Sequence, residues 1–285
     1  MAGKPYTKFV DFLQAIILGV IEGITEFLPV SSTGHLILAS NFLRIEQTEF
    51  VKTFEIAIQS GAVLSVVFLY GKTILKDIEL IKRVLIAFIP TAIIGLTLYK
   101  FIKQYLIGNA EIVLLSLFLG GIVLIAVELL LKVRGERTER SEGARLQAKR
   151  TGVDAEATGP RALTYERAFV IGLFQSVAMI PGVSRAAATI IGGMIVGLPR
   201  KTAVEFSFLL AIPTMLAATA LDIQQTSFVF DPNQWAALAV GLITSFFVAL
   251  MAIKWLLKYV QHHNFIAFGI YRIVLSLLYF LLILN

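Results

Sequence analysis

Two glutamates, Glu22 and Glu26, lie four residues apart within an apolar stretch of the chain. Residues at this spacing share one face of an α-helix, so the two carboxylates are expected to lie side by side. Neighbouring carboxylates are tolerated when they share a proton, bind a cation or face an arginine. Because ionisable groups inside a bilayer are costly, they point to function. The pair is therefore a candidate for acid–base catalysis, and the alternative is a carboxylate that caps or pairs within the fold.

Small hydroxyl residues follow this pair directly after Pro29, in the order Ser31, Ser32, Thr33, Gly34 and His35. We expect the run to begin a helix whose free backbone N–H groups bind phosphate oxygens, with Ser31, Thr33 and Gly34 as contacts. Ser32 and His35 are three residues apart, so one helical turn brings the hydroxyl near the imidazole. Either is a candidate nucleophile with an acid–base neighbour, and a water activated by them is the third candidate. Helix capping by the hydroxyls and a hydrogen-bonded buried histidine are the alternatives.

Arg185 stands at the centre of a second broken apolar stretch, in the run Pro181-Gly182-Val183-Ser184-Arg185. A guanidinium placed inside a membrane requires an oxyanion that matches its planar fork. The candidates are the two glutamates and a substrate phosphate, and a purely structural Arg–Glu pair is the alternative. Ser184 and Thr189 are expected to add phosphate contacts, and Gln59 is placed to face the same site.

The composition excludes an ordinary soluble domain. Of 285 residues, 57% are hydrophobic and 15% are charged, whereas soluble domains are about 45–50% apolar and about 25% charged. The absence of cysteine excludes disulfides, thiolate catalysis and zinc–thiolate sites. The net charge of +6 is interpreted first as a signal of membrane topology, so no nucleic-acid partner is expected.

Hydropathy predicts an all-α polytopic membrane protein. About 20 apolar residues cross a bilayer, and this length is met at 54–70, 83–101, 111–131, 203–221, 235–255 and 264–284. The stretches 10–43 and 166–198 are too long for one span and carry polar centres. They are therefore predicted to be re-entrant helical hairpins, which are tolerated when buried in protein or lining a wet cavity. The apolar run after the N-terminus has no small-residue cleavage site and is expected to be retained.

The two halves of the chain resemble each other. Residues 15–22 align with 168–175, and Pro29, Ser32 and Phe54 align with Pro181, Ser184 and Phe206. Each half reads as one re-entrant hairpin plus three spans, which gives a first repeat at 1–131, a linker at 132–165 and a second repeat at 166–285. Because three spans is an odd number, the second copy must be inverted.

The basic residues set the predicted orientation. Lys and Arg gather on the side that carries the 71–83 loop and the charged 132–167 segment, which places that side in the cytoplasm and both termini outside. The 134–160 part of this segment is charged and non-periodic, and it is predicted to be a solvated linker.

The longest motif, Glu22-Gly23-Ile24-Thr25-Glu26-Phe27-Leu28-Pro29-Val30-Ser31-Ser32-Thr33-Gly34-His35, together with 181–185, resembles the bacitracin-resistance family of undecaprenyl-diphosphatases. The similarity covers essentially the whole chain, including segments 54–59 and 205–210. The resemblance implies a hydrolase of the bacterial cytoplasmic (inner) membrane. It would convert undecaprenyl diphosphate to the monophosphate carrier lipid used in peptidoglycan synthesis, which supports cell shape and gives bacitracin resistance.

The resemblance also assigns roles to individual residues. It implies an acidic motif at Glu22 and Glu26, a hydroxyl or nucleophilic role for Ser32, a functional histidine at His35 and a phosphate-binding arginine at Arg185. It implies a divalent cation, Mg²⁺ or Ca²⁺, with the two glutamates as candidate ligands. The family commonly has Ser-Gly after the arginine, whereas this chain has Ala186-Ala187. Phosphate contacts in this loop are therefore expected from Ser184, Arg185 and Thr189.

The expected partners follow from this function. They are a polyprenyl diphosphate lipid and the surrounding membrane lipid, and a second copy of the chain is a further candidate. A transporter or flippase of polyprenyl phosphates, which would use the same inverted repeat, is the alternative function. It is ranked second because Ser32 and His35 are not needed for transport alone.

Overall fold

The computed structural model describes residues 7, 9–101, 106, 110–145, 163–225 and 230–283. These residues form helices and their connections, with a single isolated β-bridge between Thr7 and Ile45. In chain order the helices are α1 (Phe12–Thr25), α2 (Ser32–Phe42), α3 (Glu49–Lys76), α4 (Ile78–Phe101), α5 (Ala110–Arg145), α6 (Tyr165–Val177), α7 (Arg185–Ile195), α8 (Arg200–Gln225), α9 (Pro232–Tyr259) and α10 (Ile266–Ile283).

Helix starts follow local capping chemistry. Asp11 accepts a hydrogen bond from the backbone N–H of Gln14, and the Gln14 side chain accepts one from the backbone N–H of Asp11, which forms a capping box at α1. Asp231 and Gln234 repeat this arrangement at α9, where Pro232 occupies the first helical position. Such caps satisfy backbone donors that the first turn of a helix leaves unpaired.

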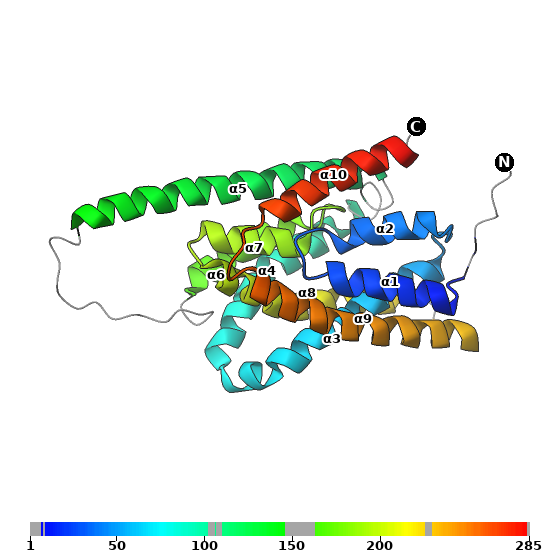
Figure 1. Cartoon of the computed structure of the whole chain (residues 1–285). Coiled ribbons are helices and arrows are strands. Elements are labelled where there is room, and N and C mark those ends of the chain that lie inside the picture. The colour runs from blue at the N-terminus through cyan, green and yellow to red at the C-terminus, as the bar shows by residue number, and fades with distance from the viewer. Residues whose placement is uncertain are drawn as a thin grey trace.

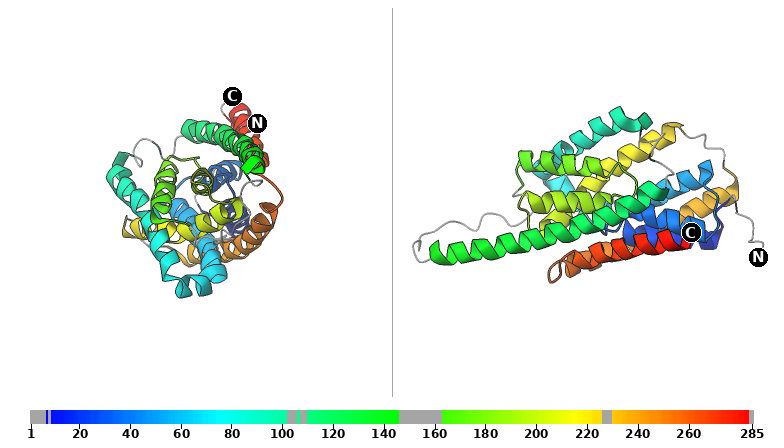
Figure 2. Two further views of the ribbon diagram at one scale, coloured as in Figure 1. Left: turned by 90° about the vertical axis from the view of Figure 1, so that its left-hand side faces the viewer. Right: turned by 90° about the horizontal axis from the view of Figure 1, so that it is seen from above.

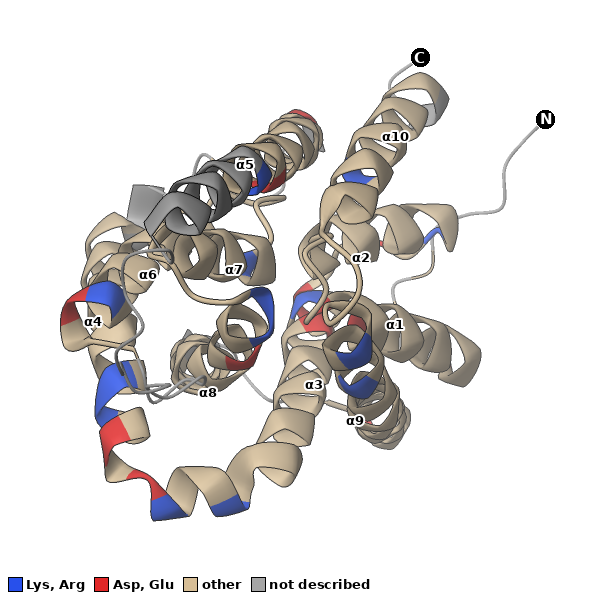
Figure 3. Ribbon diagram, turned by 60° about the vertical axis from the view of Figure 1, so that its left-hand side comes forward, with Lys and Arg blue, Asp and Glu red and all other residues tan. Residues whose placement is uncertain are grey.

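Five helices of the described residues, α3, α4, α5, α8 and α9, are long and apolar enough to cross a membrane. This confirms the prediction of an all-α polytopic membrane protein. The expected span 264–284 corresponds to α10, whose apolar part Ile266–Leu281 is shorter. Charged residues are absent from most of the ribbon of the described spans and gather at places such as the connection between α3 and α4 (Figure 3).

The broken stretches form two pairs of short helices. Helices α1 and α2 have 14 and 11 residues, and α6 and α7 have 13 and 11. At a rise of 1.5 Å per residue, none of the four spans a bilayer core of about 30 Å. The α1–α2 hairpin enters from one end of the molecule and the α6–α7 hairpin from the other, so that their connecting loops meet near the middle (Figure 1). The inverted repeat itself stays a prediction.

Helix α5 continues to Arg145 and projects beyond the other helices (Figure 2), so it takes up the first part of the predicted 132–165 linker. The reason is local: residues 132–145 are rich in Glu, Arg and Lys, which are good helix formers. Extending an existing helix also avoids the cost of nucleating a new one. Residues 146–162 of the predicted linker lie outside the described residues.

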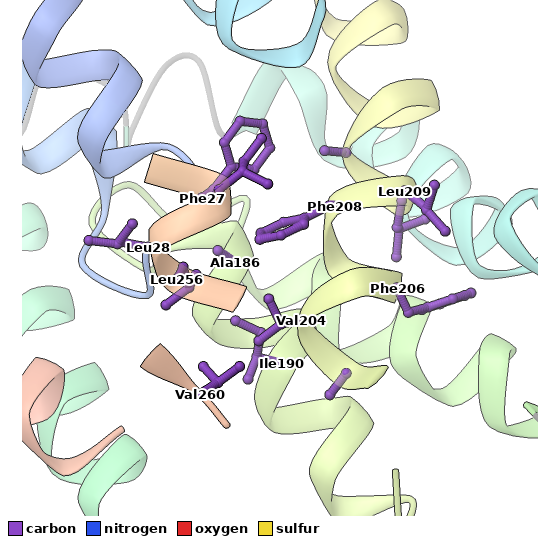
Figure 4. Packing of buried hydrophobic residues seen from close by; sticks show 14 of the residues in the cluster. Phe27, Leu28, Ala186, Ile190, Val204, Phe206, Phe208, Leu209, Leu256 and Val260 are labelled. Carbon is purple, nitrogen blue, oxygen red and sulfur yellow. The ribbon is translucent and has the colours of Figure 1, made fainter. Parts of the chain in front are cut away.

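A buried apolar cluster lies beside the meeting loops (Figure 4). Phe27, from the first loop, packs edge-to-face on Phe208 of α8 with ring centroids 5.2 Å apart. Ala186 and Ile190 of α7 belong to the same cluster. Because Phe27 follows Glu26 and Phe208 follows Ser207, this packing fixes the backbone that carries two polar residues of the site described below.

Outside these loops, Glu128 connects three elements through its hydrogen bonds. Its buried carboxylate accepts hydrogen bonds from Arg200 Nε at 3.0 Å and Arg200 Nη2 at 2.6 Å, and from the backbone N–H of Phe265 at 3.0 Å. The three residues belong to α5, α8 and the α9–α10 connection. This ion pair therefore fixes the arrangement of these elements.

Arg200→Ala is expected to lower the free energy of unfolding by about 3 kcal/mol, because it leaves the buried Glu128 carboxylate without its cation. Because Arg200 is half-exposed, the expected loss of unfolding free energy lies near the lower end of the range for buried ion pairs. The measurement is the thermal unfolding of the purified protein in detergent. An unfolding temperature equal to that of the wild type would show that the pair is not stabilising.

Candidate active site

The two hairpin loops enclose a cavity of about 230 Å³. Its polar lining comes from the first hairpin, from the second hairpin and from the spans α3, α4 and α8. These residues are Glu26, Ser31, Ser32, Thr33, Gln59, Thr91, Gln175, Ser184, Arg185 and Thr214. Apolar side chains, including Met179, Ile180 and Met215, complete the wall. The cavity is thus lined by charged, polar and apolar side chains.

Ser32 and Glu26 form the closest polar contact of the first loop. Ser32 Oγ donates a hydrogen bond to Glu26 Oε2 at 2.6 Å, and both residues are buried. Ser31 caps α2 through its side chain and has a backbone φ of 73°, an unusual value for a non-glycine residue. Strained backbone of this kind concentrates at functional sites. The sharp turn at Ser31 places Ser32 at the first turn of α2, within reach of Glu26.

Arg185 joins the second hairpin to the same carboxylate. Arg185 Nη2 donates to Glu26 Oε1 at 3.2 Å, and Nη1 donates to the carbonyl oxygen of Ser207 at 2.9 Å. The guanidinium carbon lies 5.9 Å from the ring centroid of Phe27, and Nε is buried without a hydrogen-bond partner among the described residues. Glu26 therefore bridges a hydroxyl and a guanidinium from opposite hairpins.

Glu22 lies behind Glu26. It is 0% exposed, does not line the cavity, and neither of its carboxylate oxygens has a hydrogen-bond partner in the described part of the chain. Glu26 is its nearest carboxylate neighbour, and Glu55 and Arg185 also act on it electrostatically. Glu26 is the C-cap residue of α1, and its backbone N–H donates to the carbonyl oxygen of Glu22 at 2.9 Å, so the two residues lie one helical turn apart as predicted.

His35 lies on α2, one turn after Ser32, and bonds to two residues other than Ser32. Its Nδ1 is 2.8 Å from the carbonyl oxygen of Ser31, and its Nε2 is 2.6 Å from Tyr271 Oη of α10. The imidazole stacks on the Tyr271 ring and does not line the cavity. The hydrogen bonds of His35 therefore go to Ser31 and Tyr271, while the Ser32 hydroxyl donates to Glu26.

The predicted phosphate-binding residues divide into two groups. Ser31, Thr33, Gln59 and Ser184 line the cavity, as predicted for a common site. Gly34 and Thr189 do not. Thr189 is buried and donates to Ser207 Oγ at 2.6 Å, so it supports the residue whose carbonyl oxygen holds Arg185. Gly34 lies beside Leu117 of α5.

Two carboxylates of the site supply part of the ligands that a divalent cation needs. Glu22 offers two unpartnered oxygens, and Glu26 lies beside it, but no group of three His, Cys, Asp or Glu side chains occurs among the described residues. Mg²⁺ is commonly held by one or two carboxylates while water and substrate phosphates supply its other ligands. The residues present fit a cation of that kind.

Several cavity residues lie beyond what the motifs indicated. Gln175 Nε2 donates to Thr91 Oγ1 at 2.9 Å, and Thr214 Oγ1 donates to Gln175 Oε1 at 3.3 Å. The available signal was the run Ile-Pro-Thr, which occurs at 89–91 in α4 and at 212–214 in α8. A proline inside a span frees a carbonyl group and favours nearby polar partners.

Comparisons with known proteins show the family of the chain. The family described as "Bacitracin resistance protein BacA" matches residues 15–278. A protein of Sulfurihydrogenibium sp. named undecaprenyl-diphosphatase is 51% identical over 94% of this chain and 98% of its own length. Proteins of the same name from Aquifex aeolicus and Wolinella succinogenes are 49% and 43% identical, over 93% and 94% of this chain and 96% and 97% of their own lengths.

Proposed function

The chain belongs to the bacitracin resistance protein BacA family, and we infer from this premise that it is an undecaprenyl-diphosphatase. It is a multi-pass membrane enzyme that hydrolyses undecaprenyl diphosphate to undecaprenyl phosphate and inorganic phosphate. This reaction recycles the carrier lipid of cell-wall synthesis and underlies bacitracin resistance. The transport alternative is not favoured.

We propose that three hydrogen-bonded residues, Ser32, Glu26 and Arg185, carry out the chemistry. A hydroxyl that donates to a buried carboxylate is the arrangement of a nucleophile and its general base. A guanidinium beside them matches the fork geometry of phosphate oxygens. The first residues of α2 and α7 add helix N-termini directed at the cavity, which favour a phosphate there.

The proposed reaction has two steps. In the first, Ser32 Oγ attacks the terminal phosphorus, its proton passes to Glu26, and the P–O bond to the lipid-bearing phosphate breaks. Undecaprenyl phosphate leaves, and the proton on Glu26 passes to it. In the second, water attacks the phosphoserine and gives a proton to Glu26, which returns it to the departing Ser32 oxygen. Arg185 leaves Glu26 Oε1 as the diphosphate arrives and binds the transferring phosphoryl group.

A divalent cation, Mg²⁺ or Ca²⁺, would neutralise part of the diphosphate charge. Glu22, with its free oxygens, and Glu26 would hold it. Ser31, Thr33, Ser184 and Gln59 orient the phosphates around it. The apolar part of the lining, which includes Met179 and Met215, is the proposed exit of the polyprenyl tail.

We further propose the bacterial inner membrane as the location, with both termini and the opening of the first hairpin on the outer side. The support is the asymmetry of Lys and Arg along the sequence. The enzyme then acts on lipid that faces outward.

The test is phosphate release from a polyprenyl diphosphate by the purified protein in detergent, with and without EDTA. We expect release that stops on chelation and returns when Mg²⁺ or Ca²⁺ is added in excess, since Glu22 offers a free carboxylate. Full activity in EDTA would contradict the proposed requirement for a cation. If folded protein releases no phosphate under any metal condition, the proposed site chemistry is wrong.

A further inference from the structure

Arg272 of α10 is the largest side chain in the fully buried part of the described protein, with 0% exposure. Its guanidinium donates to carbonyl oxygens only. Nη1 bonds to Pro29 at 3.3 Å, Nη2 to Gly182 at 3.0 Å and to Ser116 at 3.1 Å, and Nε to Leu117 at 3.3 Å. A single cation therefore contacts both hairpin loops and helix α5.

These contacts lie directly behind the cavity. Pro29 lies two residues before Ser31 and three before the candidate nucleophile Ser32, and Gly182 lines the cavity three residues before Arg185. Gly182 has a backbone φ of 91°, which favours glycine and turns its carbonyl group toward Arg272. Among the hydrogen bonds of the described residues, Arg272 is the side chain from outside the two hairpins that bonds to both loops. Two side chains of the second hairpin also reach the first: Ser184 Oγ donates to the carbonyl oxygen of Leu28 at 3.5 Å, and Arg185 Nη2 donates to Glu26 at 3.2 Å.

Glycine residues in the surrounding helices leave space for this guanidinium. A methyl group at Gly120 of α5 would collide with Arg272 Nη2, and one at Gly121 would lie 2.7 Å from the carbonyl oxygen of Gly269. Glycine at these positions allows α5 and α10 to approach closely while leaving space for the charged fork. The neighbouring Tyr271 contacts His35, so α10 holds the first hairpin at two adjacent residues.

We propose that Arg272 is a positioning residue that fixes the separation of the two hairpin loops, and with it the placement of Ser32 against Arg185. The planar fork is essential because it offers donors in several fixed directions, whereas lysine carries its donors on one nitrogen and cannot span both loops. A loss of placement by about 1 Å at a reacting centre costs about 10²-fold in rate. The kinetic part of this inference rests on the proposed function.

The experiment compares Arg272→Lys with Gly120→Ala, which keeps Arg272 but displaces its guanidinium. We expect kcat to fall about 10²-fold in both, with the KM for the lipid within about threefold, because the phosphate-binding groups remain. The matched controls are Arg200→Lys, which alters an arginine bonded to Glu128 far from the cavity, and Gly71→Ala, whose added methyl group meets nothing within 4 Å. Both controls should keep the wild-type kcat.

A second readout is independent of activity. Because the chain has no cysteine, spin labels are introduced through Phe42→Cys on α2 and Val177→Cys on α6, both exposed. Electron–electron distance measurements should give a narrow distribution in the wild-type background and a broader one with either Arg272→Lys or Gly120→Ala. If Arg272→Lys does not fold, or if the two variants give different distance distributions, the result for Gly120→Ala decides whether the proposal stands.

A distribution as narrow as that of the wild type overturns the proposal whatever the kinetics, because the loops are then held without Arg272. A broad distribution with wild-type kcat also overturns it. If the wild-type protein itself releases no phosphate, the proposed function fails. The distance measurement still tests whether Arg272 fixes the separation of the two hairpin loops.

Discussion

The Ser32→Ala protein is expected to release phosphate at a rate at least about 10⁴-fold below that of the wild type, because loss of a nucleophile in a covalent mechanism has effects of this size or larger. Ser32 Oγ donates at 2.6 Å to Glu26, which is therefore positioned to take its proton. The measurement is single-turnover phosphate release at saturating lipid, together with trapping of the phosphoenzyme by acid quenching.

The matched control is Ser65→Ala, which removes another buried hydroxyl. Ser65 Oγ bonds within its own helix to the carbonyl oxygen of Ala62 and does not line the cavity. We expect this variant to keep the wild-type rate.

His35→Ala separates the two candidate nucleophiles. Since His35 does not line the cavity, and bonds to the carbonyl oxygen of Ser31 and to Tyr271, its replacement should cost far less activity than that of Ser32 and leave a phosphoenzyme. The opposite order, with an active Ser32→Ala protein and no phosphoenzyme in His35→Ala, would falsify the proposed role of Ser32.

The pairing of Ser32 with Glu26 shows what spacing along a helix can and cannot predict. The four-residue separation of Glu22 and Glu26 lies within one helix, so its geometry follows from the helical repeat and was predicted. Ser32 and His35 also lie within one turn, but the first residue of a helix is oriented by the loop before it. The positive φ of Ser31 turns this loop so that the hydroxyl faces back to Glu26.

Contacts across the chain were predictable only where a motif marked both partners. Arg185 and Glu26 are 159 residues apart, yet each stands in a polar interruption of an apolar stretch, and their meeting was one of the alternatives considered. Arg272 stands alone in an apolar span, and the acceptors that hold it are backbone carbonyls, which carry no sequence signal. Its contact with both loops therefore required the structure.

Arg185→Ala is expected to lower kcat/KM by about 10³-fold or more, the range observed when an arginine that stabilises a transferring phosphoryl group is lost. The guanidinium is poised for this role because one of its two hydrogen bonds, to the Glu26 carboxylate at 3.2 Å, is exchangeable for a phosphate oxygen. Its anchor on Ser207 at 2.9 Å keeps the group in the cavity during the exchange.

Arg185→Lys distinguishes charge from geometry. Lysine restores a cation beside Glu26 but not the planar fork, so the variant should regain stability while remaining at least about 10-fold less active than the wild type. Arg83→Ala is the control, because Arg83 lies outside the cavity, where it interacts with Glu79 at 3.9 Å and with the ring of Tyr165. A fully active Arg185→Lys protein would reduce the role of Arg185 to charge neutralisation. If Arg185→Ala instead loses thermal stability but keeps kcat/KM per folded molecule, the Glu26–Arg185 pair is purely structural and the phosphate must be bound by the helix N-termini alone.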